Sequence, residues 1–227
     1  MVRVKICGLM NQRDVNLCIK AGVHMTGFVV DYPIDVPWNL DVDKACELIR
    51  NTPPFVSTCV VTGGSPEKVL ETVGKTHPDV VQLHYEETLE EIEKIAYELR
   101  MKGIKTIKAL RIDAYGNCRF EIPDPAMAAR ELARTGISAI LADSFTPSMP
   151  GGTGVAVHLS VFQAIKQESS LPVILAGGLN PANIFETVQK TRPYAVDVLT
   201  GVETKPGSKD PLKIDSLMNI IGNAHLD

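Results

Sequence analysis

Short runs rich in Val, Ile and Leu alternate along this chain with longer segments in which apolar residues recur at helical spacing. A short apolar run is typical of a buried strand, and apolar positions three and four residues apart are typical of an amphipathic helix. The alternation predicts repeated βα units around a parallel sheet. We count eight such units.

The predicted strands share this enrichment in branched apolar residues. They are Arg3–Cys7, Gly27–Val30, Val56–Val61, Val80–His84, Thr106–Ile112, a strand from Ala139 that ends at Asp143, Pro172–Ala176 and Ala195–Leu199. Capping chemistry predicts where helices begin. The predicted starts are Asn11, Asp41, Ser65-Pro66, Pro125 and Asn180-Pro181. Residues 31–40 and 113–124 show neither period and are expected to be irregular.

The eight units follow one another with no shift in composition between them. This favours a closed barrel over a doubly wound sheet, so we predict the α/β class with residues 1–227 forming a single (β/α)8 TIM barrel domain. In such a barrel the working face lies at the C-terminal ends of the strands. Residues far apart in the sequence are therefore expected to meet there.

Composition narrows the class of protein. Of 227 residues, 44% are hydrophobic and 22% charged, which is typical of a soluble globular protein. The net charge of -4, with no block of like charge, argues against nucleic acid as a partner. Five scattered cysteines indicate reduced thiols in the cytoplasm. The N-terminus begins with a strand pattern, so no signal peptide is expected. No apolar run is long enough to span a membrane, so no membrane partner is expected.

Asp143 is the first candidate for chemistry. It follows the apolar residues Ile140 to Ala142, and a carboxyl group among apolar neighbours has a raised pKa that lets it donate a proton near neutral pH. The alternative is that Asp143 caps the next segment or pairs with Lys5 or Lys108.

Three glycine-containing turns follow the last three predicted strands, at Gly151–Gly154, Gly177–Gly178 and Thr200–Gly201. Backbone N–H groups in such turns bind phosphate, and barrels often bind phosphate in these loops. The alternative is that each is only a tight turn. Together they predict a phosphate site beside Asp143.

Cys7 lies at the end of the first predicted strand, where nearby positive charge could ionise the thiol into a base. Lys5 is two residues earlier and should point into the same lumen. The alternative is a small buried hydrophobic residue. His84 ends the fourth predicted strand and either contacts a ligand or stabilises a loop. The other histidines lack metal-ligand spacing, so no metal is expected.

Several motifs recur in the order in which one known family carries them. They are Lys5-Ile6-Cys7-Gly8, Gln82-Leu83-His84, Leu141-Ala142-Asp143-Ser144, Gly151-Gly152-Thr153-Gly154, Leu175-Ala176-Gly177-Gly178-Leu179-Asn180-Pro181, Val196-Asp197-Val198, Gly201-Val202-Glu203 and Pro206-Gly207-Ser208-Lys209-Asp210. Across the whole chain the sequence resembles the phosphoribosylanthranilate isomerases of tryptophan biosynthesis.

The resemblance implies an aldose–ketose isomerase that performs an Amadori rearrangement without a cofactor. A general acid protonates the ribose ring oxygen, and a general base removes the C2 proton of the resulting Schiff base. It implies Asp143 as the acid and Cys7 as the base. The residues implied to hold the phosphate are Gly152, Thr153, Gly154, Gly177, Gly178, Thr200 and Gly201. Those implied to contact the rest of the phosphosugar substrate are Lys5, His84 and Asp197.

The chain departs from the family around the aromatic half of the substrate. The family's arginine after the second strand, which meets the anthranilate carboxylate, is absent from residues 31–40. We expect Trp38 to stack on the anthranilate ring and Arg111 or Arg119 to supply the positive charge. Tyr85 replaces a glycine, and Leu199-Thr200 replaces a serine pair.

Three functions are compatible with this pattern. The first is the isomerase with a rebuilt anthranilate pocket. The second is a paralogous isomerase of a different phosphosugar, which the missing arginine would explain. The third is a phosphometabolite-binding barrel without turnover, which would not need two proton carriers. The sequence leaves both a monomer and a homodimer open.

Overall fold

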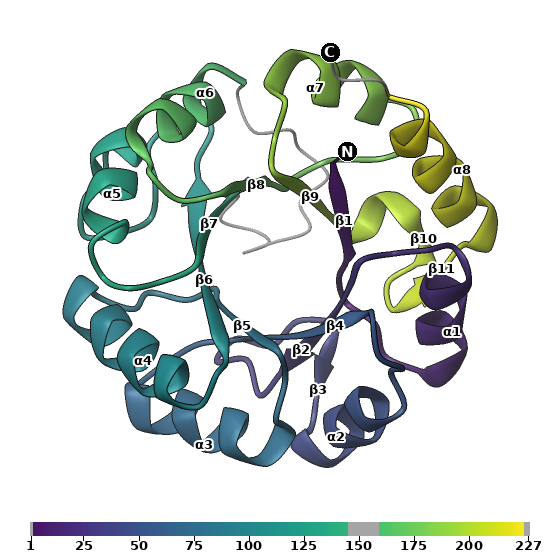
Figure 1. The fold of residues 1–227 in the computed structure, drawn as a ribbon, viewed down its shortest axis with the longest axis horizontal. Coiled ribbons are helices and arrows are strands. Elements are labelled where there is room, and N and C mark those ends of the chain that lie inside the picture. Colours follow the sequence, from purple (N-terminus) through teal and green to yellow (C-terminus); the bar gives the residue numbers. More distant parts are fainter. Residues whose placement is uncertain (1, 145–158, 225–227) are drawn as a thin grey trace.

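The computed structural model describes residues 2–144 and 159–224, and within them eight parallel strands close into a barrel surrounded by helices (Figure 1). The barrel strands are β1 (Arg3–Ile6), β2 (Met25–Val30), β4 (Ser57–Thr62), β5 (Val80–Leu83), β6 (Lys105–Ile112), β7 (Ala139–Ser144), β8 (Val173–Leu175) and β9 (Ala195–Val198). They pair in chain order, and β1 closes the ring by pairing with both β2 and β9. The predicted TIM barrel is confirmed.

Helices alternate with these strands and form the outer layer (Figure 1). They are α1 (Gln12–Lys20), α2 (Val42–Arg50), α3 (Pro66–Thr76), α4 (Leu89–Met101), α5 (Pro125–Leu132), α6 (Leu159–Glu168), α7 (Ile184–Thr191) and α8 (Pro211–Gly222). No helix in the described ranges is long and apolar enough to cross a membrane.

Local capping chemistry sets most helix starts where the sequence predicts them. The side chains of Asn11, Asp41 and Ser65 each accept a hydrogen bond from a backbone N–H in the first turn. The start predicted at Asn180-Pro181 is wrong, because α7 begins at Ile184. The side chains of Asn180 and Asn183 both donate to the carbonyl of Gly178 instead, which holds residues 178–183 in a turn.

Two short elements were not predicted from the sequence. β3 (Asn39–Leu40) adds to the edge of β2 at the end of the irregular loop. Between β9 and α8, a 3₁₀ turn, η1 (Thr200–Val202), leads into an antiparallel hairpin of β10 (Glu203–Lys205) and β11 (Ser208–Lys209). Both additions lie at the C-terminal ends of barrel strands.

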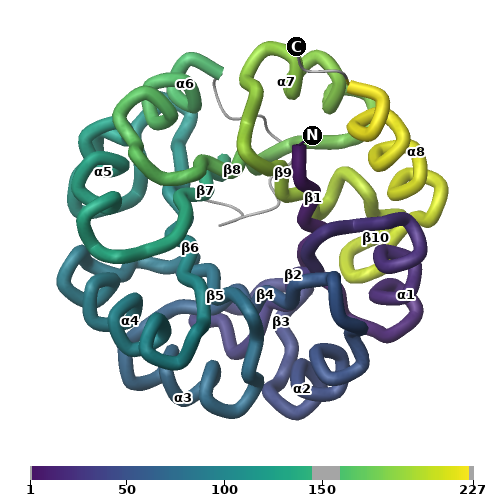
Figure 2. The backbone as a smooth tube through the Cα atoms, viewed as in Figure 1, coloured from purple at the N-terminus to yellow at the C-terminus, as the bar shows by residue number. Residues whose placement is uncertain are grey.

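Strand alternation divides the core into two layers. Side chains such as Val4 and Ile6 pack outward against the helices, whereas Cys59 and Leu141 fill the lumen. The first and last strands lie side by side at the ring closure (Figure 2). Lys5 points into the lumen, as predicted, and its register partner on β9 is Asp197.

Candidate active site

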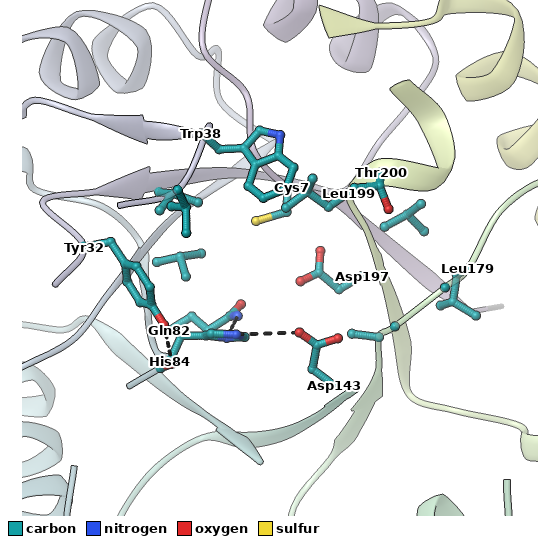
Figure 3. A pocket seen from close by; sticks show the side chains of 17 residues that line it. Cys7, Tyr32, Trp38, Gln82, His84, Asp143, Leu179, Asp197, Leu199 and Thr200 are labelled. Carbon is teal, nitrogen blue, oxygen red and sulfur yellow. Dashed lines mark hydrogen bonds and ion pairs between the residues drawn. The ribbon is translucent and has the colours of Figure 1, made fainter. Parts of the chain in front are cut away.

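A cavity that is partly open to solvent lies where the C-terminal ends of the strands meet (Figure 3). Its polar side chains come from strand ends or the residues that follow them, and they are Cys7, Gln82, His84, Asp143, Asp197 and Thr200. Its apolar wall comes mainly from β2, the loop after it and β4, and consists of Val29, Tyr32, Val36, Trp38 and Val61. Figure 3 shows the sulfur of Cys7 and the carboxyl groups of Asp143 and Asp197 directed into the same space.

Cys7 follows β1, and its side chain packs closely against the neighbouring strand. A Cβ atom on Gly27 of β2 would lie 3.0 Å from the Cys7 Sγ and 3.0 Å from the Lys5 Cε. Gly8 has a φ of 69°, which turns the chain away immediately after the thiol. Burial raises the pKa of the Cys7 thiol, and the Lys5 charge opposes that shift. Lys5 is thus the group that favours the thiolate.

Lys5 and Asp197 form a buried ion pair beneath the cavity, with 2.6 Å between Nζ and Oδ2. Burial alone would lower the pKa of Lys5, but the negative charges of Asp197 and the neighbouring thiols raise it above its ordinary value. Lys5 therefore stays protonated. It supplies a fixed positive charge under Cys7 and offsets the cost of burying the Asp197 carboxylate.

Asp143 lies on β7 and is 6% exposed. Burial, and next the charge of Asp197, raise its pKa to about 7, although the Ser144 backbone N–H donates to its Oδ1 at 2.9 Å and acts in the opposite direction. The expected lysine partners are engaged elsewhere, Lys5 with Asp197 and Lys108 with Glu87. Asp143 is therefore a carboxyl group that can hold and release a proton near neutral pH.

His84 lies directly after β5 and faces Asp143 across the cavity (Figure 3). Its Nε2 is 3.6 Å from the Asp143 Oδ2, and its Nδ1 is 3.0 Å from the Gln82 amide nitrogen. The Tyr32 hydroxyl donates to the His84 carbonyl at 2.9 Å. Sequence reasoning missed Gln82 and Tyr32 as site residues. The i, i+2 spacing of Gln82 and His84 was the available signal, since both side chains point inward.

The predicted phosphate turns that the structure describes lie together at one side of the cavity. Gly177, Gly178 and Thr200 line it. Gly177 and Gly178 have φ values of 86° and 63°, and a Cβ on Gly177 would come within 2.7 Å of the Ser144 hydroxyl. Gly201 packs against the turn after β8, where a Cβ would lie 1.9 Å from the Leu179 carbonyl oxygen. Gly152, Thr153 and Gly154 lie outside the described residues.

Of the three residues expected at the aromatic half of the substrate, only Trp38 is among the cavity-lining residues. Arg111 faces the lumen as the register partner of Asp143, but it is 2% exposed and is not among the cavity-lining residues. Its guanidinium lies 3.4 Å from the Glu86 carboxylate and 6.0 Å from the centre of the Tyr85 ring. Arg119 also pairs with Glu86, at 3.2 Å, and is half exposed.

The arrangement suits proton transfer on a small anionic substrate. Two groups that can exchange protons, Cys7 and Asp143, come from different strands and border one cavity. Glycine turns at one side can donate backbone N–H groups to a phosphate. Among the described residues, no group of three or more His, Cys, Asp or Glu side chains is arranged to hold a metal ion.

Comparison with known proteins agrees with this geometry. The family model of N-(5'phosphoribosyl)anthranilate (PRA) isomerase matches residues 4–220. The N-(5'-phosphoribosyl)anthranilate isomerase of Geobacter metallireducens is 38% identical over 215 residues, covering 94% of this chain and 96% of that protein. That of Methanosarcina acetivorans is 33% identical over 214 residues, covering 93% and 90%. A crystal structure of phosphoribosyl anthranilate isomerase in complex with reduced 1-(o-carboxyphenylamino)-1-deoxyribulose 5-phosphate has a TM-score of 0.77 at 32% identity, covering 99% and 98%.

Proposed function

The chain belongs to the N-(5'-phosphoribosyl)anthranilate isomerase family of tryptophan biosynthesis, and we propose that Cys7 and Asp143 carry the isomerisation. The reaction converts the aminoaldose N-(5'-phosphoribosyl)anthranilate to the aminoketose 1-(2-carboxyphenylamino)-1-deoxyribulose 5-phosphate. Residues 1–227 act as one barrel domain. Its cysteines are free in the described structure, which suits an enzyme of the cytoplasm.

The observation that carries this assignment is that both proton carriers are buried at one cavity and each lies beside a charged neighbour. Asp143 is buried among apolar neighbours and beside Asp197, so a pKa of about 7 keeps part of it protonated at neutral pH. Burial raises the pKa of the Cys7 thiol, and the adjacent buried ammonium of Lys5 opposes that rise by favouring the thiolate. A general acid and a general base are thus held on two walls of one cavity.

The reaction begins with two proton transfers, and a tautomerisation completes it. Asp143 protonates the ribose ring oxygen, the C1–O bond breaks, and the anthranilate nitrogen supplies the electrons that form a protonated Schiff base at C1. The Cys7 thiolate removes the C2 proton, and the C2 electrons move toward C1 and neutralise the iminium to give an enolamine. Tautomerisation of the enolamine yields the ketone. Asp197, held by Lys5, faces the sugar hydroxyls, and His84 faces the carboxylate that Asp143 becomes.

The phosphate is expected at the glycine turns after β8 and β9. Gly177, Gly178, Thr200 and Gly201 offer backbone N–H groups there, and we assign Gly152 to Gly154 to the same role by family resemblance. Since Gly177 packs directly against Ser144, the phosphate turn is fixed relative to Asp143. Fixing both ends of the substrate converts its binding energy into orientation at the reacting carbons.

The anthranilate ring is expected against the apolar wall that includes Trp38, Val36 and Val61. None of the described residues that line the cavity is Lys or Arg. We assign the carboxylate to Arg111, the cation on β6 that faces the lumen beside Asp143. Binding would require its guanidinium to exchange Glu86 for the substrate carboxylate, a bidentate contact of greater strength.

The decisive experiment follows the loss of anthranilate-type fluorescence when purified protein is mixed with freshly prepared substrate. Turnover is expected in the wild type. Cys7→Ser and Asp143→Asn should each lower kcat by roughly 10² to 10⁴. Lys105→Gln, at the opposite end of the barrel, is the control and should remain within about twofold. No turnover by the wild type, or full activity in both site variants, would contradict the assignment.

A further inference from the structure

Trp38 is held by a buried carboxylate from the far end of the chain. The Trp38 Nε1 donates to the Glu203 Oε1 at 3.0 Å, across 165 residues of sequence. Trp38 is 3% exposed and Glu203 7%. Tryptophan has one N–H donor, so this bond fixes the direction in which the edge of the indole that carries Nε1 points.

Glu203 is itself held from several directions. The Lys209 Nζ donates to the same Oε1 at 2.8 Å, and the Gly207 backbone N–H does so at 3.1 Å. Lys209 also donates to the Leu199 carbonyl at 3.3 Å. Since Glu203 and Lys209 begin and end the β10–β11 hairpin, the hairpin fastens the loop after β9 to the loop after β2.

The indole lies against the backbone that follows the catalytic thiol. A Cβ on Gly8 would be 2.9 Å from the Trp38 Cδ1 and 3.1 Å from the Leu199 Cγ. Figure 3 shows Trp38 beside Cys7 at the side of the cavity away from Asp143. The indole is therefore held between close packing against Gly8 and the hydrogen bond from its Nε1 to Glu203.

The covalent structure of the substrate indicates which part of it would lie against Trp38. The phosphate is on C5, the base acts at C2, and the aromatic ring is attached through nitrogen to the adjacent C1. With the phosphate at Gly177, Gly178 and Thr200, the aromatic ring must lie beyond Cys7 on the other side of the cavity. Trp38 lies next to Cys7, so it is the large aromatic surface closest to that ring.

We propose that Glu203 is a positioning residue for substrate specificity, which holds the Trp38 indole as a fixed wall for the aromatic ring of the substrate. This inference rests on the proposed function for the identity of the ring, although the anchoring of Trp38 does not depend on it. A fixed aromatic wall compensates in part for the arginine that residues 31–40 lack, since an ordered surface loses little entropy on binding.

The experiment uses the fluorescence of Trp38, the single tryptophan of the chain. Two double variants differ only in whether residue 203 keeps an acceptor oxygen: Glu203→Met with Lys209→Met removes it, and Glu203→Gln with Lys209→Met retains it. Replacing both charges avoids leaving one of them buried and unpaired. Glu87→Gln, which disrupts the other buried Lys–Glu pair away from Trp38, controls for general loss of stability.

In the Met/Met variant we expect Trp38 emission at longer wavelength, stronger quenching by acrylamide, and a KM raised roughly three- to tenfold, the range of an aromatic pair, with kcat nearly unchanged. The Gln/Met variant and Glu87→Gln should keep the wild-type emission maximum. If Met/Met does not fold, Trp38→Phe, which keeps a ring and loses the N–H, should show the same rise in KM.

Equal emission and equal KM in the two double variants would overturn the inference while leaving the proposed function intact, and so would an unchanged KM in Trp38→Phe. If the wild type does not convert the substrate, the proposed function fails, and with it the assignment of the ring. In that case the emission of the two double variants still decides whether Glu203 anchors Trp38.

Discussion

The two mouths of the barrel are both hollow and both carry charged residues, yet only one has the character of an active site. The hollow at the N-terminal mouth is the larger of the two. At the C-terminal mouth the carboxyl groups of Asp143 and Asp197 are buried, and Asp197 pairs with the buried Lys5 beneath the cavity. At the N-terminal mouth Arg3 and Lys105 are exposed. Size therefore does not identify the active site, whereas the burial of charge does.

The difference is energetic. Burying a carboxylate or ammonium costs several kcal/mol unless neighbours compensate for it, and the resulting strain appears as shifted pKa values, such as the value of about 7 for Asp143. At the N-terminal mouth Arg3 lies 4.8 Å from the Tyr194 ring in contact with water, an inexpensive arrangement. Shifted and mutually dependent charges are thus a better guide to chemistry than volume.

The largest expected contrast compares Lys5, which is buried in the lumen against Asp197, with Lys105, which is exposed at the N-terminal mouth. Lys5→Met leaves Asp197 buried without its partner and should lower the free energy of unfolding by about 3–5 kcal/mol. Lys105→Met removes an exposed charge and should change it by less than about 0.5 kcal/mol. Urea unfolding at pH 7 measures both. Equal losses in the two variants would show that burial of the charge is not what distinguishes the mouths.

The second contrast concerns the stability that the folded protein loses because the pKa of Asp143 is raised. Because the pKa of Asp143 rises from 3.8 in the unfolded chain to about 7 in the folded protein, the folded state binds the extra proton between these values, and stability falls as pH rises from about 4 to 7. Asp143→Asn removes this cost. At pH 8 it should be more stable than wild type by up to about 4 kcal/mol, with the gain vanishing near pH 4.

The exposed loop residue Asp35 provides the matched control, since Asp35→Asn removes a carboxyl group at the surface and should change the free energy of unfolding at pH 8 by less than about 0.5 kcal/mol. A variant of Asp143 that loses stability at pH 8 would contradict the raised pKa. The expected combination of higher stability and lost activity is characteristic of a group retained for chemistry.

A third test is the pH dependence of turnover. The active form needs protonated Asp143 and ionised Cys7, and burial raises the pKa of that thiol. The value of kcat/KM should rise tenfold per pH unit below about 7, remain level up to the pKa of the thiol, and then fall. His84, Arg111, Asp197 and Lys5 also face this pair. A profile without a break near pH 7, or one that changes in Lys105→Gln, would contradict the assignment.

The smallest expected effect lies at the N-terminal mouth. Phe55 has a φ of 73° and a fully exposed side chain. Phe55→Gly should raise the free energy of unfolding by about 1 kcal/mol, because glycine adopts this conformation without steric cost. Phe55→Ala keeps the Cβ and should be close to neutral. Thermal unfolding measures both, and a loss of stability in the glycine variant would mean that the phenyl ring is covered in solution.

The parts of the molecule that sequence predicted are those governed by local chemistry. Alternation placed Lys5 in the lumen, and capping side chains placed the starts of α1, α2 and α3. The start of α7 was missed because it depends on side-chain bonds to the Gly178 carbonyl, which have no periodic signature.

The composition of the site was predicted less completely, for a different reason. Cys7 and Asp143 were found because they end apolar runs. Asp197, the partner of Lys5, lies 192 residues away from it in the sequence. Glu203, the partner of Trp38, lies 165 residues away. Only barrel closure brings each pair together. Pairing over such separations depends on strand register, which neither composition nor local spacing specifies.

The bond between Lys5 and Asp197 joins the first strand of the barrel to the last, and this has a consequence for synthesis of the protein. A ribosome adding about 5–20 residues per second needs roughly 10 to 40 s to pass from residue 5 to residue 197. Throughout that interval the nascent chain holds an ammonium without its carboxylate and a thiol without its final environment. Catalytic competence is therefore acquired in one late step, when the last strand is released and the ring closes, and fragments ending before it should be inactive and prone to proteolysis.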